Sequence, residues 1–185
     1  LATSKYNKKK VLSFLEDEKY LDAILKNEFI VAVICTEKIF SSKLIPDNYG
    51  VIISSNPKQT FFEIHNMLAE KQFYWKQFKK EISEHAIIGS HSIQIGCNTV
   101  IEPSVVIHPG VVIGNNVIIR SGTQVGSNGF EFINNGQEVF SVMTAGKAVI
   151  KDNVEVQHNC CIDRGILGKD TILEKNVKLD NFVHI

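Results

Sequence analysis

Few cysteines, no net charge and no long apolar run mark the 185-residue sequence, and each absence excludes a class of protein. Its four cysteines, at positions 35, 97, 160 and 161, form no Cys-x-x-Cys pair. A zinc knuckle or a disulfide framework is therefore not indicated. Twenty basic and twenty acidic residues cancel, so neither a nucleic-acid surface nor a polybasic membrane patch is predicted. No apolar run approaches the ~20 residues of a transmembrane segment.

The first residues, LATSKYNKKKVL, carry charge but lack the apolar stretch of a secretion signal. Together with the cysteine pattern, this predicts a reduced, cytoplasmic compartment. The six histidines include no close pair with the spacing of metal ligands. We therefore expect no metal site and no tightly bound cofactor.

What the sequence does have is a period of six. Over residues 95–125 a large aliphatic residue recurs at every sixth position, with a small or β-branched residue two places before it. A helix repeats at about 3.6 residues and a half-buried strand at about 2, whereas a period of six predicts a hexapeptide β-helix. Three hexads, about 18 residues, close one triangular coil. The large residues, which should point inward, are Ile95, Ile101, Ile107, Ile113, Ile119 and Val125.

The six-residue period returns near the end of the chain after two interruptions. A step of twenty-five residues precedes Ile150, and a step of eleven precedes Leu173. The first interruption predicts a loop at 126–149, and the second predicts one irregular corner. The resumed inward positions are Ile150, Val156, Ile162, Leu173, Leu179 and Ile185.

The predicted loop at 126–149 carries three candidate binding residues, Gly129, Phe130 and Phe132. A loop of this length in a regular solenoid is usually functional or disordered. Its aromatic residues argue against disorder, so we predict a functional segment.

The residues ahead of the hexads predict a small α/β unit. Turn-rich sequence and an Asn-Pro step separate its elements. The expected strands are 11–15, 29–36 and 51–55, and the expected helices are 16–27 and 58–73. We place this domain at residues 1–80 and the β-helix at residues 81–185.

Three segments, one in the predicted loop and two in the predicted β-helix, are similar to segments of a known family. They are NGFEF (128–132), IDRG (162–165) and KLDN (178–181). With them, and with its α/β unit, the chain resembles the UDP-3-O-acylglucosamine N-acyltransferase family of lipid A synthesis. The resemblance implies a left-handed parallel β-helix, a homotrimer with active sites between subunits, and a histidine general base. It also implies acyl transfer from a thioester on acyl carrier protein to the amino group of a UDP-sugar.

The resemblance also implies a uridine site in the α/β domain. Phe14, Asp17 and Tyr20 match the family's F-x-x-N-x-x-Y pattern, with Asp17 in place of the family's asparagine. Phe14 and Tyr20 would sandwich a planar base. An ionised Asp17 accepts hydrogen bonds but cannot donate them, so it fits a uracil edge less well than an amide does.

For catalysis, the resemblance places the main base two positions beyond Ile185. Asp180 matches the aspartate that would support that imidazole. His158, in a Gln-His-Asn segment, and His184, which should point outward toward the donor, are the other catalytic candidates. Because the last inward residue would leave an open coil, we expect these residues to be part of a longer chain and inactive alone.

Two further expectations concern structure. Asp163 and Arg164 should form a pair at the irregular corner. The outward apolar residues Val106, Val112 and Ile118 should favour a homotrimer.

Three functions remain open from the sequence. The first is N-acylation of a nucleotide-linked amino sugar, with acyl carrier protein or CoA carrying the thioester co-substrate. The second is an acetyl-CoA-dependent N-acetyltransferase of a deoxyamino-sugar nucleotide. The third is a non-catalytic trimeric hexapeptide scaffold.

Overall fold

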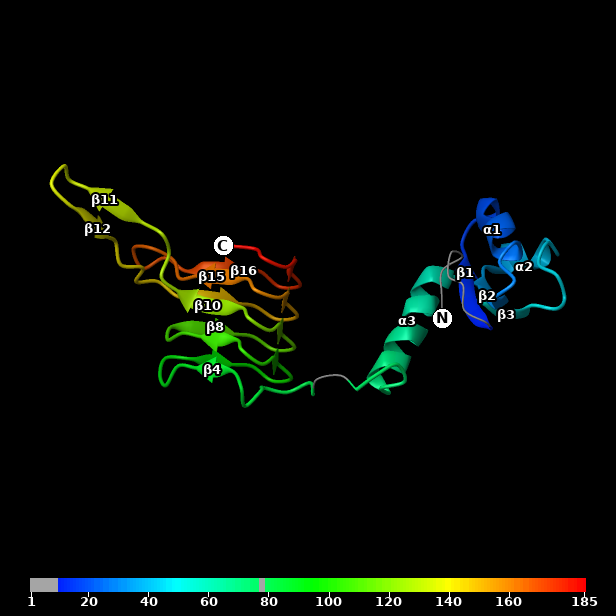
Figure 1. The fold of residues 1–185 in the computed structure, drawn as a ribbon, viewed down its shortest axis with the longest axis horizontal. Helices are drawn as coiled ribbons and strands as arrows, with labels where there is room; N and C mark the ends of the chain where they lie inside the picture. The colour runs from blue at the N-terminus through cyan, green and yellow to red at the C-terminus, as the bar shows by residue number, and fades with distance from the viewer. Residues whose placement is uncertain (1–9, 77–78) are drawn as a thin grey trace. The chain divides into compact units, whose positions relative to one another are not determined.

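A computed structural model describes residues 10–76 and 79–185. The described residues form two compact units, one on either side of residues 77 and 78. The division lies three residues before the domain boundary placed from the sequence. Figure 1 colours the first unit blue to teal and the second green to red.

The first unit is a three-stranded parallel sheet in the order β1–β2–β3. Helical segments connect the strands and supply part of the core around Ile24 and Ile39. Both residues are buried among the aliphatic side chains of the sheet. The elements are β1 (Val11–Leu15), η1 (Glu18–Tyr20), α1 (Leu21–Leu25), β2 (Ile30–Cys35), α2 (Glu37–Ser41), β3 (Gly50–Ile53) and α3 (Pro57–Glu70).

Side-chain caps explain where these helices begin. The predicted helix at 16–27 is shorter, because Asp17 accepts a hydrogen bond from the Lys19 amide and starts a 3₁₀ turn at residue 18. Thr36 caps α2, an element that the sequence analysis did not predict. Asn56 caps α3, whose first residue is a proline, and α3 ends three residues earlier than predicted. Each cap satisfies an amide that has no partner within the helix.

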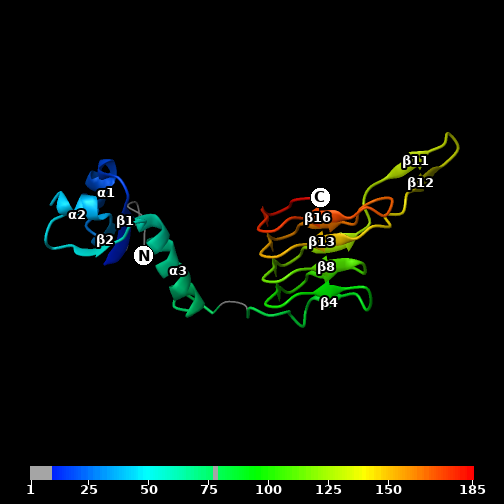
Figure 2. The ribbon, with the colours of Figure 1, turned by 180° about the vertical axis from the view of Figure 1, so that it is seen from behind.

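The second unit is a parallel β-helix, which confirms the predicted fold. Its strands are short and stack into three four-stranded parallel sheets, one for each face of a triangular coil. Both views show the stacked coils (Figures 1 and 2). The first sheet holds β4 (Ile87–Ile88), β7 (Val106–Ile107), β10 (Gln124–Ser127) and β15 (Cys161–Asp163). The second holds β5 (Gln94–Ile95), β8 (Val111–Ile113), β13 (Ala148–Ile150) and β16 (Thr171–Leu173), and the third holds β6 (Val100–Ile101), β9 (Ile118–Ile119), β14 (Glu155–Val156) and β17 (Lys178–Leu179).

The pairing register explains both interruptions of the period. Gln94 pairs with Val112, eighteen positions later, as one full coil requires. Val112 pairs with Val149, thirty-seven positions later, so nineteen extra residues leave the coil between them. Ala148 pairs with Thr171, twenty-three positions later, so five extra residues form the irregular corner.

Most of the predicted inward positions form the core of the β-helix. Ile95 and Leu179 are half-buried against that core, and the prediction is wrong for Ile185, which is 43% exposed. The residues from Ile101 to Val125 that carry the six-residue period are buried, as are Ile150, Val156 and Ile162. Thr123 is an inward polar residue, and its hydroxyl donates to the Gln157 carbonyl and accepts from the Cys160 amide. Burial of this hydroxyl is therefore compensated by two hydrogen bonds.

The corners of the coils use left-handed backbone. Residues with positive φ recur every six positions, mostly glycine, serine and asparagine, which tolerate this conformation. Phe182 occupies the same position with φ 61°, although a bulky residue is rare there. The regular corner residues are Ser92, Asn98, Ser104, Gly110, Asn116, Gly122, Asn153, Asn159, Asn176 and Phe182.

The predicted loop at 126–149 is mostly an ordered hairpin. β11 (Phe132–Asn134) pairs antiparallel with β12 (Val139–Ser141), and the hairpin extends away from the stacked coils in both views (Figures 1 and 2). Side chains of the hairpin, including Phe130 and Phe132, are exposed. The phenylalanines therefore do not fold back onto the coils.

Within residues 10–76 and 79–185, none of the helices has both the length and the apolar character needed to cross a bilayer.

Candidate functional site

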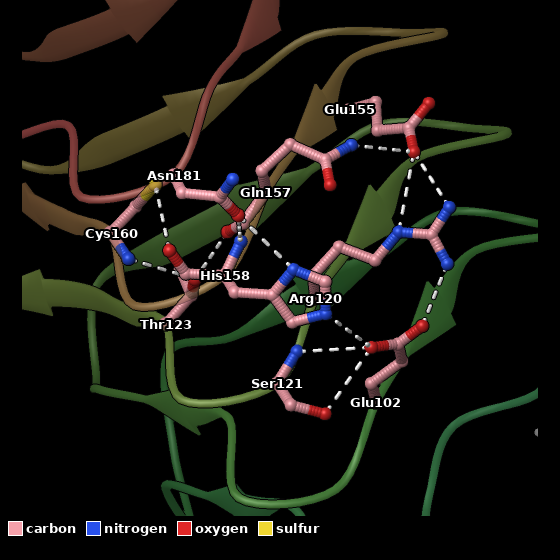
Figure 3. Close-up of polar contacts among 9 residues, drawn as sticks. All are labelled: Glu102, Arg120, Ser121, Thr123, Glu155, Gln157, His158, Cys160 and Asn181. Atoms are coloured by element: carbon pink, nitrogen blue, oxygen red, sulfur yellow. Dashed lines mark hydrogen bonds and ion pairs between the residues drawn. The ribbon is translucent and has the colours of Figure 1, made fainter.

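A connected set of polar groups lies on the face formed by β6, β9, β14 and β17, at its following corner and in the core beneath that corner (Figure 3). We call this set the His158 network. Its members come from four successive coils, and parallel stacking places them side by side. They are Glu102, Arg120, Ser121, Thr123, Glu155, Gln157, His158, Cys160 and Asn181.

Arg120 joins three coils of the network. Its Nη1 lies 2.7 Å from Glu102 Oε1, and its Nη2 lies 2.7 Å from Glu155 Oε1. Only 7% of the Glu102 side chain is exposed, and its second oxygen accepts from the amide and hydroxyl of Ser121. Burial raises the pKa of Glu102, but the hydrogen bonds from Arg120 and Ser121 outweigh it and hold that pKa below its usual value.

His158 lies at the exposed edge of the network. Asn181 Oδ1 accepts from the His158 backbone amide at 3.1 Å and lies 3.2 Å from its Nδ1. Because Oδ1 only accepts, Nδ1 must carry a proton, and Nε2 of the neutral ring is left as an acceptor. Glu102 Oε2 lies 3.8 Å from Nε2, so the ring stands between an amide oxygen and a carboxylate. The arrangement can therefore accept a proton.

Asp180 positions Asn181. Its Oδ1 accepts from the amide of Asn181 at 2.8 Å and from Asn181 Nδ2 at 3.1 Å. These bonds orient the Asn181 amide group with its oxygen toward His158. Asp180 is an exposed residue, and in the described part of the chain no hydrogen bond to its Oδ2 is found.

His184 lies on a different face and contacts Asp163. Its Nε2 is 2.8 Å from Asp163 Oδ2, and its side chain is exposed, as predicted. The expected pair between Asp163 and Arg164 is wrong, because Arg164 donates to Asn128 Oδ1 instead. β15 ends at Asp163, and Asp163 is instead bonded by Ser127 and His184. Burial raises the pKa of Asp163, but hydrogen bonds from Ser127 and His184 outweigh it and lower that pKa.

The predicted nucleotide residues lie in the first unit. The ring of Phe14 packs on Phe61, with centroids 5.1 Å apart, and on Phe62 at 6.3 Å. Tyr20 is exposed, and the Lys19 ammonium lies 4.9 Å from its ring centroid. Across residues 10–76 no ring contact joins Phe14 to Tyr20, so the sandwich is not preformed.

The Asp17 carboxylate caps the 3₁₀ turn η1. It accepts from the Lys19 amide and lies 3.1 Å from Lys19 Nζ. The hydrogen bond from the Lys19 backbone is the main cause of a lowered pKa of Asp17. The group is therefore ionised at neutral pH.

The three loop candidates lie at the base of the hairpin. Gly129 approaches Thr144 and Asp163, so a side chain here would contact both. The rings of Phe130 and Phe132 meet edge to face with centroids 4.8 Å apart. Phe130 is 86% exposed, which leaves an aromatic surface available to a ligand.

Comparison with known proteins adds two findings. Residues 92–127 match the family model for the bacterial transferase hexapeptide (six repeats). A stretch of 92 residues is 41% identical to a UDP-3-O-acylglucosamine N-acyltransferase from Janthinobacterium sp. (strain Marseille), which is 50% of this chain and 26% of that protein. The chain resembles these acyltransferases.

Two shorter matches carry the same name. The protein from Dechloromonas aromatica (strain RCB) is 45% identical over 65 residues, which is 35% of this chain and 18% of the relative. The protein from Saccharophagus degradans (strain 2-40 / ATCC 43961 / DSM 17024) is 46% identical over 65 residues, 35% of this chain and 19% of the relative. The matched part thus spans about a quarter or less of each of these acyltransferases.

Sequence reasoning missed Glu102, Arg120, Glu155 and Asn181. The spacing of eighteen between Glu102 and Arg120 is one full coil, and this signal was present in the sequence. The link from Arg120 to Glu155 spans thirty-five positions and includes the hairpin. It becomes visible only when the register across that insertion is known.

Proposed function

We propose that this protein is an N-acyltransferase that moves an acyl group from a thioester to the amino group of a UDP-linked amino sugar, as in lipid A synthesis. The observation that carries the proposal is the 92-residue stretch that is 41% identical to a UDP-3-O-acylglucosamine N-acyltransferase. The hexapeptide β-helix supports it, because the matching repeat model describes bacterial transferases.

The proposed reaction needs a proton acceptor for the amine. Nitrogen attacks the thioester carbonyl, the amine loses a proton, and the thiol leaves. Following the resemblance, we assign the main base to the position two residues after Ile185. Asp180 would then support it, since the residue is exposed and only its Oδ1 is engaged, by Asn181. His158, whose side chain is about half exposed and whose Nε2 lies 3.8 Å from Glu102 Oε2, is the competing base among the described residues.

The first unit is the proposed nucleotide-binding part. The exposed Tyr20 ring and the edge of the Phe14 cluster offer stacking surfaces for a base. Tyr20→Ala should weaken UDP binding by about 1–3 kcal/mol, since base stacking on an aromatic ring contributes that much. Asp17→Asn should strengthen it, because an amide both donates and accepts and still caps a helical turn. Calorimetry with UDP that finds equal affinity in both variants and the wild type removes this site.

The donor and acceptor are tested together by mass spectrometry of the acylated sugar. Acyl carrier protein thioesters and acyl-CoA are each offered with UDP-3-O-acylglucosamine and with a 4-amino deoxysugar nucleotide. We expect N-acylated UDP-sugar from the carrier-protein thioester. Product only from acetyl-CoA and the deoxysugar favours the second function, and no product from any pair, with a chain that extends to the proposed base, favours the scaffold.

Asp180 is tested within the same assay. Asp180→Asn should lower kcat by about tenfold or more, a part of the 10²–10⁴-fold that positioned acid–base groups contribute. Glu174→Gln, an exposed carboxylate that pairs only with Lys151 in the described structure, is the matched control and should leave kcat unchanged. Loss of all turnover in His158→Asn, with turnover retained in Asp180→Asn, would assign the base to His158 instead.

A homotrimer completes the proposal. Val106, Val112 and Ile118 point outward and are only partly covered within one chain. Burial of such residues between subunits is a favourable way to remove them from water. Sedimentation at micromolar concentration should give three chains per particle, and a monomer would contradict this.

A further inference from the structure

Three side chains that bind metals in many proteins meet on the face that carries the hairpin. They are Cys161, Asp163 and His184, and one ligand atom from each lies within 4.8 Å of the others. Cys161 and Asp163 are two positions apart on β15, so their side chains leave the strand on the same side. Cys161 pairs with His184 in the next coil through a parallel bridge. The strand register therefore builds the cluster from two segments, a grouping that the spacing of the histidines did not indicate when no metal site was expected.

Hydrogen bonds link the three side chains of this cluster. His184 Nε2 lies 2.8 Å from Asp163 Oδ2, and Cys161 Sγ donates to Asp163 Oδ1 at 3.2 Å. Ser127 Oγ also donates to Asp163 Oδ1 and lies 3.3 Å from Cys161 Sγ. Both the thiol and the imidazole are thus directed at one carboxylate. A cation between the three groups would replace the thiol proton, which passes to solvent, and the imidazole would bind it through a nitrogen lone pair.

The three groups form a ligand set with a definite preference. A thiolate and a carboxylate bring two negative charges, and a neutral imidazole brings a nitrogen, which together match a doubly charged ion. Thiolate and imidazole ligands favour zinc-type ions over the oxygen-preferring Mg²⁺ and Ca²⁺. The only positively charged side chain adjacent to these ligands in sequence, Arg164, is bonded to Asn128.

We propose that Cys161, Asp163 and His184 bind one zinc-class divalent cation. Three protein ligands leave a fourth tetrahedral position for water or a substrate atom. The buried Asp163 and half-buried Cys161 form the inner side of the site, and His184, with 63% of its side chain exposed, forms the outer side. Ser127 hydrogen-bonds Asp163 and so orients this ligand, as residues around metal ligands commonly do. The site does not depend on the proposed acyl transfer.

Cobalt(II) is the probe for the proposed site, because a thiolate ligand gives Co²⁺ a near-ultraviolet charge-transfer absorption. We expect this absorption, visible bands of a tetrahedral ion, and displacement of the cobalt by one equivalent of Zn²⁺. Cys161→Ser should abolish the charge-transfer band, and His184→Ala should weaken Zn²⁺ binding at least tenfold in calorimetry. Cys97→Ser removes an exposed thiol elsewhere on the β-helix and should change neither result.

Thermal unfolding of the same variants tests whether a loss of metal binding results from misfolding. Serine is close in size to cysteine and can keep the hydrogen bond to Asp163, so Cys161→Ser should retain the thermal transition of the metal-free protein. Zn²⁺ should raise that transition in the wild type and leave it unchanged in Cys161→Ser. A band that survives in Cys161→Ser, equal Zn²⁺ affinity in wild type and His184→Ala, or loss of binding in Cys97→Ser would each overturn the assignment.

Discussion

The two units of the chain organise their polar side chains over different distances. In the α/β unit, Thr36 and Asn56 cap helices by bonding amides three positions away. In the β-helix, Asn98 bonds Asn116 across eighteen positions, and Arg120 bonds Glu155 across thirty-five. Local caps are set by neighbouring residues in the sequence. The β-helix instead depends on the register of its coils, and a change in one coil should therefore affect the next.

The largest expected effect on stability comes from the inward-pointing aliphatic residues that stack through the β-helix. Ile119 is completely buried between coils, and Ile119→Ala should destabilise that unit by about 2–5 kcal/mol through lost burial and a cavity. Hydrogen exchange of the two units, followed separately, should show faster exchange in the β-helix only. Ile172→Ala, at an exposed aliphatic position, is the control and should have a small effect. Equal losses of stability in both variants would mean that the inward aliphatic residues do not form the core.

The next effect concerns the charges that join coils. Arg120→Met leaves the nearly buried Glu102 without its cation and should cost about 1–3 kcal/mol, as an unsatisfied buried group does. The value is below that of a fully buried pair because about a third of Arg120 is exposed. Denaturant unfolding measures it. An unchanged midpoint would show that the pair is neutral, and Lys151→Met, in an exposed pair with Glu174, is the control.

The ion pairs of Arg120 with Glu102 and Glu155 also predict that the stability of the β-helix depends on pH. The folded-state pKa of Glu102 is lowered, so its contribution to stability is complete above the usual glutamate pKa of about 4.5 and is lost as the pH falls through the folded value. Glu102→Gln should therefore flatten the acid side of the stability curve of the β-helix. Unfolding midpoints measured from pH 7 to pH 3 test this. Parallel curves for wild type and variant would exclude the contribution.

Helix caps provide the corresponding test in the α/β unit. Asn56→Ala should cost about 1 kcal/mol, because the amide of Gln59 loses its acceptor at the start of α3. Because the cap is local, exchange should increase in the first turn of α3 and leave the β-helix unaffected. Glu63→Ala, further along α3, keeps the cap and is the control. Faster exchange in the β-helix would contradict a local role.

The smallest effect should be a gain. Phe182 is 77% exposed and adopts left-handed backbone, where the equivalent corners use glycine, serine or asparagine. Phe182→Asn should stabilise the β-helix by about 0.5–1 kcal/mol, since asparagine tolerates this conformation and little packing is lost. Thermal unfolding measures the gain, with Asn116→Ala as the opposite change at an equivalent corner. A loss of stability in Phe182→Asn would show that its ring packs in the assembled protein.

The six-residue period was sufficient to predict the β-helix, most of its inward residues and both interruptions. The reason is that each inward position is repeated, so the core does not depend on any single residue. The hairpin inside 126–149 was missed because its strands are three residues each and carry no period. The short helix after Thr36 was missed because its apolar residues are too few to form a stripe.

The candidate sites were less predictable than the fold. His184 was expected to face outward, but its partner Asp163 lies twenty-one positions away in the preceding coil. Asp180 and Asn181 are neighbours in sequence, yet their connection to His158 requires knowledge of the coil register. Chemistry that is assembled from three or four coils is visible only once the coils are aligned.

N-acyl transfer is tested most directly by a pair of acceptors that differ at one atom. UDP-3-O-acylglucosamine and its 2-hydroxy analogue, in which oxygen replaces the amino nitrogen, are each incubated with the protein and an acyl carrier protein thioester. We predict that mass spectrometry finds one added acyl group on the amino sugar and none on the hydroxy analogue. Equal acylation of both acceptors, or acylation of neither by a chain that extends to the proposed base, would contradict N-acyl transfer by this β-helix.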